Sequence, residues 1–214
     1  MMDTQDKSAI VYRTVKRGLD ILGSGMFLLL SMPLMVALAI AVRCRMGSPV
    51  LFRHTRPGFH GQSFGCLKFR TMTGARDENG NLLADNERLT SMGIFLRRYS
   101  LDELPQFWNV FKGEMSLVGP RPLEMRYLPL YTSEQNRRHL VKPGITGWVQ
   151  INGRNALSWE EKFALDTWYV DHCGLWLDIQ ILFLTAWKVF SGDGISYAGH
   201  ATMPDFLGTP EKPE

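Results

Sequence analysis

The chain has 214 residues, enough for one compact domain with an appendage or for two small domains. A hydrophobic content of 45% supports a packed core, and the formal net charge of +3 is mild. Cys44, Cys66 and Cys173 are odd in number and widely spaced, which excludes a disulfide framework and a paired zinc motif. No convincing signal peptide is visible, because the first apolar run starts late and lacks a small-residue cleavage site.

The first element along the chain is an apolar run over residues 19–42, in which only Asp20 is charged. Its length suits a membrane helix, which needs about 20 apolar residues. A buried helix of a soluble protein usually keeps a polar stripe, and from Ile21 onward this run has none. We therefore expect the run to enter a membrane.

The topology of this run has two readings. Basic residues flank both ends, so neither end is an obvious outside. Pro33 lies near the middle, where it removes one helix hydrogen bond, and the Ser31 hydroxyl is placed to bond a freed carbonyl. One reading is a helix-break-helix that dips into the bilayer and returns to the same face. The other is an ordinary kinked span, because membrane helices tolerate proline.

The remaining chain is predicted to alternate short strands and helices. Residues 49–52 and 63–69 read as two strands joined by a turn over 56–61. Residues 74–88 read as a polar loop, and helices are predicted over 89–98, 100–111, 133–141, 159–170 and 175–190. The last helix, with a tryptophan near each end, fits a membrane interface and a buried core equally well. The tail from residue 191 onward reads as mostly irregular.

Asp102 and Glu103 are the first candidates for chemistry. Adjacent carboxylates at a helix start point about 100° apart, so they need not share one task. One can attack phosphorus while the other holds a metal, and magnesium needs only one or two carboxylates plus substrate phosphates. The competing interpretation is structural, because Ser100 and Glu103 have the spacing of a capping box.

Arg121 lies between two prolines, which hold the backbone of this loop rigidly. A planar guanidinium suits phosphate, although a stiff surface turn with a solvated arginine remains open. Other basic residues beside turns are candidate phosphate ligands, namely Lys68, Arg70, Arg97 and Arg154. Neither a Walker loop nor a Gly-x-Gly-x-x-Gly fingerprint is present, so neither nucleotide-binding fold is supported.

With these motifs, the chain resembles the small monotopic phosphoglycosyl transferases of bacteria, which begin glycan assembly on polyprenyl phosphate. The resemblance runs from about Tyr12 to Gly208 and rests on six stretches in order. They are Lys16-Arg17-Gly18-Leu19-Asp20, Thr55-Arg56-Pro57-Gly58, Lys68-Phe69-Arg70-Thr71-Met72, Ser100-Leu101-Asp102-Glu103-Leu104-Pro105-Gln106, Met115-Ser116-Leu117-Val118-Gly119-Pro120-Arg121-Pro122 and Pro143-Gly144-Ile145-Thr146-Gly147-Trp148.

The resemblance implies a reaction. Asp102 would be the nucleophile that takes the phosphosugar from a UDP-sugar and releases UMP, and Glu103 would be linked to Mg²⁺. Undecaprenyl phosphate would then accept the phosphosugar. The tail, with Gly194-Ile195-Ser196, Gly199-His200-Ala201-Thr202 and Phe206, is similar to members that use UDP-linked diacetamido-trideoxyhexoses.

The resemblance also implies an architecture. It predicts a mixed α/β, mainly helical fold with interfacial amphipathic helices and a re-entrant membrane segment broken at Pro33. Met32 stands where the family often has serine before this proline. We expect a membrane segment over 1–48, a catalytic domain over 49–190 and a substrate-side tail over 191–214. The expected location is the cytoplasmic face of the inner bacterial membrane, with a homodimer left open.

Two other functions remain open. A noncatalytic membrane-anchored module would use the same basic loops to hold an anion. Protein surfaces that bind nucleic acid rarely carry embedded acidic residues, so no nucleic-acid partner is expected. A nucleotide-sugar hydrolase would release sugar phosphate without needing a lipid. Release of UMP that depends on the lipid phosphate separates these readings.

Overall fold

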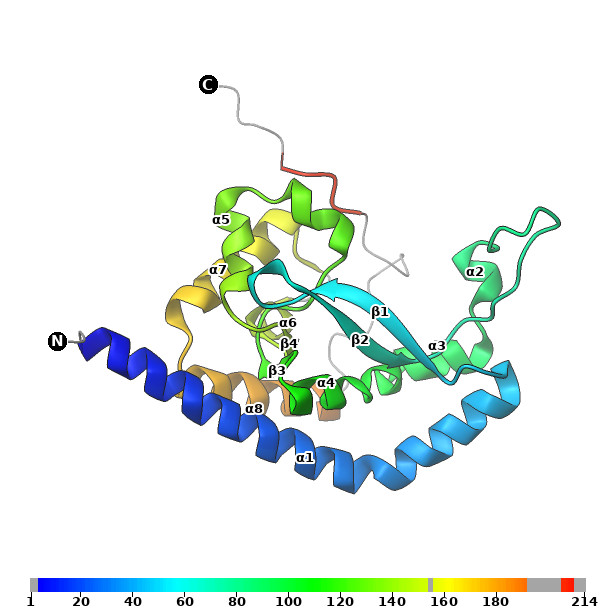
Figure 1. Ribbon diagram of the computed structural model, residues 1–214, viewed down its shortest axis with the longest axis horizontal. Coiled ribbons are helices and arrows are strands. Elements are labelled where there is room, and N and C mark those ends of the chain that lie inside the picture. Colours follow the sequence, from blue (N-terminus) through cyan, green and yellow to red (C-terminus); the bar gives the residue numbers. More distant parts are fainter. Residues whose placement is uncertain (1–3, 154–155, 192–204, 210–214) are drawn as a thin grey trace.

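A computed structural model of the chain describes residues 4–153, 156–191 and 205–209 (Figure 1). One long helix, α1 (Thr4–Met46), runs along one edge of the molecule, and the other described elements all lie on the same side of this helix. The described chain is mainly helical with two small sheets, which confirms the mixed, mainly helical fold class predicted from the sequence.

Helix α1 is continuous through Pro33, so the predicted break is wrong. Pro33 removes one backbone hydrogen bond and crowds the preceding turn, and Figure 1 shows α1 bent in its middle. The Ser31 hydroxyl contacts Met35 Sδ at 3.6 Å, whereas we expected it to bond a freed carbonyl. The proline therefore bends the helix without interrupting it, and both arms rise from the bend toward the rest of the protein.

The side of the molecule that carries α1 exposes many apolar side chains. The segment from Ile10 to Met46 is long and apolar enough to cross a membrane, and only 11% of its apolar 18-residue stretch is buried inside the protein. Helices α3 (Ser91–Arg98), α4 (Gln106–Lys112) and α8 (Leu175–Ser191) add exposed apolar residues. They are Ile94, Phe95, Trp108, Phe111, Trp176, Ile179, Leu182, Phe183, Leu184 and Trp187. Full burial of α8 in the core is therefore excluded, although its Ile181 is buried.

The first sheet is the predicted hairpin. Strands β1 (Leu51–Pro57) and β2 (Ser63–Phe69) pair antiparallel, with Leu51 opposite Phe69 and Pro57 opposite Ser63. Strand β1 extends into the region expected to be turn. Residues 74–88 form the predicted polar loop, which ends in the short helix α2 (Asp85–Arg88) and projects from the body (Figure 1).

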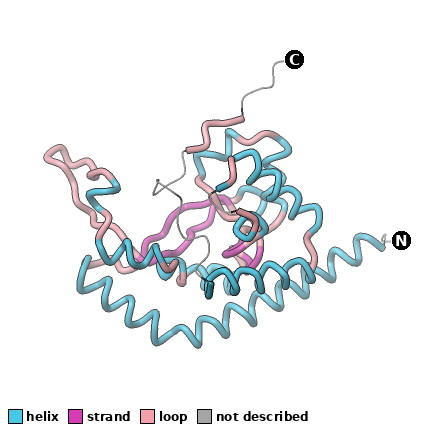
Figure 2. The backbone as a smooth tube through the Cα atoms, turned by 180° about the vertical axis from the view of Figure 1, so that it is seen from behind, coloured by secondary structure: helices cyan, strands magenta, loops and turns pink. Residues whose placement is uncertain are grey.

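The second sheet is a parallel pair of three-residue strands, β3 (Ser116–Val118) and β4 (Gly144–Thr146). The connection between them contains α5 (Ser133–Asn136) and a 3-10 helix over Arg137–Leu140, in place of the single helix expected over 133–141. Helices α6 (Trp148–Ile151) and α7 (Trp159–His172) follow. Figure 2 shows the strands in the interior between α1 and the helices on the far side of the body.

Polar contacts fasten both ends of α1 to the rest of the protein. Near the amino end, Lys16 Nζ lies 2.6 Å from Asp178 Oδ2 on α8. Arg17 donates to two carbonyls at the end of α4, at 2.7 and 2.8 Å. At the carboxyl end, the Arg70 guanidinium donates to the Met46 carbonyl. Both ends of the apolar helix are thus bonded to one globular body.

Candidate active site

The adjacent carboxylates lie between two helical pieces, because the helix expected over 100–111 is divided. A 3-10 turn spans Leu101–Glu103, and α4 begins at Gln106. Ser100 has a φ of 54° and its side chain makes no cap hydrogen bond, so the capping-box interpretation is wrong. A left-handed serine is uncommon, and such backbone strain gathers at functional sites. Here it turns the chain so that Glu103 faces cations instead of a helix end.

Glu103 is clamped by two cations. Arg121 Nη2 lies 2.5 Å from Glu103 Oε1, and Arg121 Nη1 lies 3.3 Å from Glu103 Oε2. Lys68 Nζ lies 2.7 Å from the same Oε1. This forked contact brings together three residues selected from the sequence, each from a different element. It also orients the Arg121 guanidinium, whose side chain is 44% exposed and accessible from solvent.

Asp102 is the buried member of the pair, with 6% of its surface exposed. Its Oδ2 lies 4.0 Å from Lys68 Nζ. Burial raises the pKa of Asp102, and the Lys68 charge opposes this rise. Burial acts in the same direction on Glu103, but the charges and hydrogen bonds of Arg121 and Lys68 outweigh it and lower the pKa of Glu103. The site therefore holds one firmly ionised carboxylate beside one that is weakly solvated and more basic.

The loop that carries Arg121 is fixed by close backbone contacts with β4. Gly119 N donates to the Thr146 carbonyl at 2.9 Å, and Gly144 N donates to the Pro120 carbonyl at 2.9 Å. A Cβ at Gly119 would lie 2.3 Å from the Lys142 carbonyl oxygen, and one at Gly147 would lie 2.2 Å from the Gly119 oxygen. The two glycine-rich motifs are therefore halves of one structural unit.

Lys68 is placed by its strand and by a buried amide. Asn109 on α4 accepts from Leu67 N at 3.0 Å and donates to the Gly65 carbonyl at 2.8 Å. These bonds complete the backbone pairing on the free edge of β2, and Asn109 is fully buried. The strand that carries Lys68 is thus joined to the helix that follows the carboxylates.

The other predicted phosphate ligands have different surroundings. Arg97 Nε donates to Thr71 Oγ1 at 3.1 Å, and its charge acts to lower the pKa of Asp102, so it lies near the carboxylates. Arg70 donates to the carbonyls of Met46 and Pro49, which places it at the end of α1. Arg154 lies outside the described residues, so its predicted role is untested.

A magnesium site has suitable but incomplete ligands here. Among the described residues, no group of three or more His, Cys, Asp or Glu side chains could enclose a metal. Glu103 offers an ionised carboxylate beside Asp102, the hard oxygen chemistry that Mg²⁺ takes, with phosphate oxygens of a substrate as further ligands. Both Glu103 oxygens accept from cations, so Arg121 and Lys68 would have to turn toward the substrate to free them.

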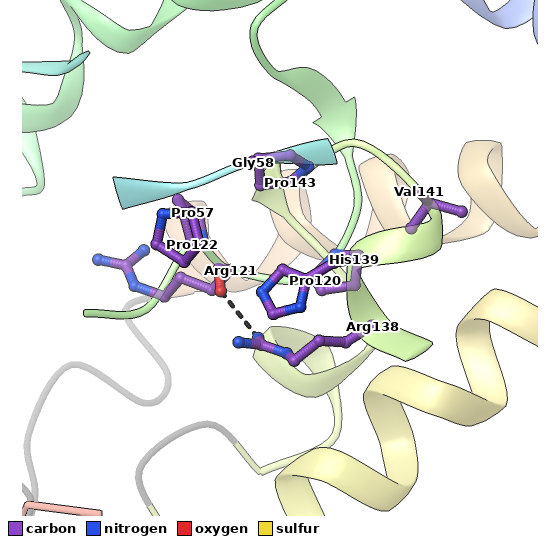
Figure 3. Close-up of a pocket in the computed structure, with 9 residues that line it drawn as sticks. All are labelled: Pro57, Gly58, Pro120, Arg121, Pro122, Arg138, His139, Val141 and Pro143. Carbon is purple, nitrogen blue, oxygen red and sulfur yellow. Dashed lines mark hydrogen bonds between the residues drawn. The ribbon is translucent and has the colours of Figure 1, made fainter. Parts of the chain in front are cut away.

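Three residues that the sequence analysis did not select also shape the site. Half-buried Arg56 lies 3.5 Å from Glu124 and belongs to a motif quoted above, which was a usable signal. Arg138 and Asp166 form a buried pair at 2.7 Å behind Arg121. Their partnership joins distant parts of the chain and has no local sequence signal. Figure 3 shows Arg138 directed at the Arg121 carbonyl, while the Arg121 side chain points the other way.

Comparison with known proteins identifies the family of this chain. Residues 11–192 match the bacterial sugar transferase family. The chain is 56% identical over 196 residues to the uncharacterized sugar transferase EpsL of Bacillus subtilis, covering 91% of this chain and 96% of EpsL. It is 41% identical over 195 residues to the UDP-glucose:undecaprenyl-phosphate glucose-1-phosphate transferase of Escherichia coli, covering 84% of this chain and 41% of that enzyme.

A further relative is the UDP-N-acetylgalactosamine-undecaprenyl-phosphate N-acetylgalactosaminephosphotransferase of Aeromonas hydrophila. The chain is 36% identical to it over 192 residues, covering 86% of this chain and 45% of that enzyme. The chain thus spans nearly all of EpsL but less than half of these two larger enzymes. Because the family match covers most of the sequence, the chain belongs to the bacterial sugar transferase family.

Proposed function

We propose that this protein transfers a sugar 1-phosphate from a UDP-sugar to undecaprenyl phosphate and releases UMP. The observation that carries the proposal is the pairing of buried Asp102 with Glu103, which Lys68 and Arg121 clamp. The names of the larger relatives state this type of transfer for two different sugars. The same cations that hold Glu103 suit a diphosphate, because both carry positive charge to a solvent-accessible face.

In the first step, an Asp102 carboxylate oxygen attacks the phosphorus nearer the sugar. A bond forms between that oxygen and phosphorus, the bond between this phosphorus and the bridging oxygen breaks, and UMP leaves with the electron pair. Negative charge grows on the leaving phosphate, where Arg121 and Lys68 can offset it as preorganised cations. Burial of Asp102 favours the attack, because a weakly solvated carboxylate is a better nucleophile than a hydrated one.

In the second step, an oxygen of the lipid phosphate attacks the same phosphorus and the ester to Asp102 breaks. The carboxylate is regenerated, so the protein is unchanged after one turnover. When bound, Mg²⁺ would supply further charge neutralisation at the diphosphate, with Glu103 as its protein ligand. The apolar side of the molecule would keep the site near the lipid headgroups, where the acceptor phosphate lies.

The membrane segment is proposed to be re-entrant, with 1–48 entering the bilayer, 49–190 catalytic and 191–214 on the substrate side. Support comes from the bend at Pro33 and from the bonds that join both ends of α1 to one body. We place that body on the cytoplasmic face of the inner membrane, where UDP-sugars are found. Basic residues near both ends of α1 favour the same face.

We propose further that the donor is a UDP-linked N-acetylated deoxyamino sugar of the diacetamido-trideoxyhexose type. The tail motifs behind this proposal at 194–202 lie outside the described residues, and Phe206 lies in an aromatic cluster with Tyr127 and Phe163. The two named relatives use glucose and N-acetylgalactosamine, so the sugar varies within the family. A screen of UDP-sugars for UMP release decides it.

The central test replaces Asp102. The Asp102→Asn variant keeps the shape of the side chain but removes the nucleophilic charge, so UMP release should fall by about 10⁴-fold. The assay uses purified protein in lipid nanodiscs with undecaprenyl phosphate and Mg²⁺. Asp171→Asn is the matched control, because Asp171 is an exposed acid that pairs with Arg137, and its turnover should be unchanged. Near-normal turnover by Asp102→Asn would remove the proposed nucleophile.

The same assay separates the alternatives. An anion-binding module would release no UMP, and a hydrolase would cleave the UDP-sugar without undecaprenyl phosphate. The proposed route predicts that donor alone leaves a phosphosugar adduct on Asp102, which mass spectrometry of peptides can locate. An adduct on another residue would contradict the assignment.

A further inference from the structure

Among the described residues, Arg138 and Asp166 form the most deeply buried ion pair, with 3% and 4% of their surfaces exposed. Arg138 Nε and Nη2 both donate to Asp166 Oδ2, at 3.0 and 2.7 Å. The guanidinium also lies 5.8 Å from the ring centre of Tyr131 and 5.7 Å from that of Phe163. The pair is therefore held in one geometry by two aromatic rings and a fork of hydrogen bonds.

The same guanidinium reaches the loop of the candidate site. Arg138 Nη2 donates to the main-chain carbonyl of Arg121 at 2.8 Å, the bond drawn in Figure 3. This loop is also constrained by backbone hydrogen bonds with β4, at Gly119 and Pro120, and by the close approach of Gly147 to the Gly119 carbonyl. Arg138 is thus the side chain that fixes the carbonyl of the very residue whose guanidinium clamps Glu103.

Stability alone does not explain this arrangement. Burying two charges costs desolvation that their attraction barely repays, and well-packed apolar residues of similar volume often stabilise a core as much or more. An apolar side chain at position 138 could fill the space between Tyr131 and Phe163. It could not donate to the Arg121 carbonyl, which would then lose its buried partner.

We propose that Arg138, held by Asp166, is a positioning residue that fixes the position of the Arg121 guanidinium relative to the diphosphate of the donor. This inference rests on the proposed function. It assigns to Arg138 no contact with the substrate, because its fork is already shared between Asp166 and the Arg121 carbonyl. Its effect on turnover should pass entirely through Arg121.

The test uses Arg138→Lys, in which a single ammonium can keep the charge pair with Asp166 but cannot also hold the Arg121 carbonyl in the same geometry. We expect kcat for UMP release to fall at least about tenfold while KM for the donor changes little. In an Arg121→Ala background, the same substitution should change kcat less than about twofold, because the residue it positions is gone. Arg137→Lys is the matched control, since Arg137 is the neighbouring arginine and pairs with surface acids.

A second measurement does not depend on turnover. Phenylglyoxal modifies exposed arginines, and mass spectrometry follows its rate at Arg121, which should rise severalfold in Arg138→Lys but stay constant in Arg137→Lys. Equal losses of kcat in both backgrounds, or an unchanged modification rate, would overturn the positioning role. An Arg121→Ala variant with wild-type turnover would instead contradict the role of Arg121 in the proposed function. Absence of UMP release from every donor would contradict that function itself, and the modification rate would still decide the role of Arg138.

Discussion

Asp102 and Glu103 are neighbours in sequence whose acidities are shifted in opposite directions by their surroundings. Burial raises the pKa of Asp102, while the cations around Glu103 lower the pKa of that carboxyl. Pairs of carboxyl groups with separated pKa values often mark two chemical roles. The firmly ionised Glu103 suits the binding of a cation, and the buried Asp102 suits attack on phosphorus.

The pH profile of turnover tests this division. Asp102 attacks only when ionised, so activity should fall as pH drops through its raised pKa, above the ordinary aspartate value of about 3.9. Lys68 opposes the rise in that pKa, so Lys68→Met should move the acidic limb of kcat to higher pH. Lys112→Met, which removes a lysine paired with Glu114, should leave the limb in place. A limb that Lys68→Met leaves unmoved would refute the assigned coupling.

At the scale of single residues, the motifs and the family resemblance together selected Asp102, Glu103, Lys68 and Arg121. Their side chains lie close together, and their roles stay predictions. The competing interpretation of Ser100 as a helix cap is wrong, because its backbone is left-handed and its side chain makes no cap hydrogen bond. A local motif cannot reveal that outcome, because Glu103 pairs with Lys68 and Arg121, which are distant in sequence, instead of completing a capping box with Ser100.

Among the elements, the β3–β4 pair decides where Arg121 stands. Its parallel strands have three residues each, and they approach so closely that glycine is required at the contact. The β1–β2 hairpin was predictable because its strands alternate and adjoin a turn. The β3–β4 pair was not predictable, because short strands separated by several helices leave no periodic signal.

Gly119→Ala tests the importance of this contact. The new Cβ would lie 2.3 Å from the Lys142 carbonyl oxygen, so the two strands must separate. We expect a loss of about 1–3 kcal/mol in the free energy of unfolding, together with reduced UMP release, since Arg121 moves with the loop. Chemical denaturation and the turnover assay measure the two effects. Gly74→Ala is the control, because a Cβ there meets no atom within 4 Å, and its stability should match the wild type.

On the scale of the whole molecule, the bent apolar helix α1 is bonded near both of its ends to the rest of the protein. Near its amino end, α1 is bonded to α8 through Lys16 and to α4 through Arg17. At its carboxyl end it is bonded through Arg70. A segment of 37 residues is about 55 Å long as a straight helix, well beyond the roughly 30 Å hydrocarbon core. A span would have to separate its two ends across the bilayer, which would break one set of these contacts.

The sidedness of the two ends therefore tests the proposed membrane arrangement. A tag at the amino terminus and a second tag in the exposed loop over 74–88 should both resist labelling by a membrane-impermeant reagent in intact cells. Both should react once the membrane is opened. Pro33→Leu restores the missing helix hydrogen bond and should straighten α1, so part of the population should expose its amino terminus outside. Leu34→Ala is the control, because it changes a neighbouring apolar side chain without restoring that bond. Tags on opposite faces of the wild-type protein would exclude the re-entrant arrangement, because the contacts of Lys16 and Arg17 with the catalytic body could not then form.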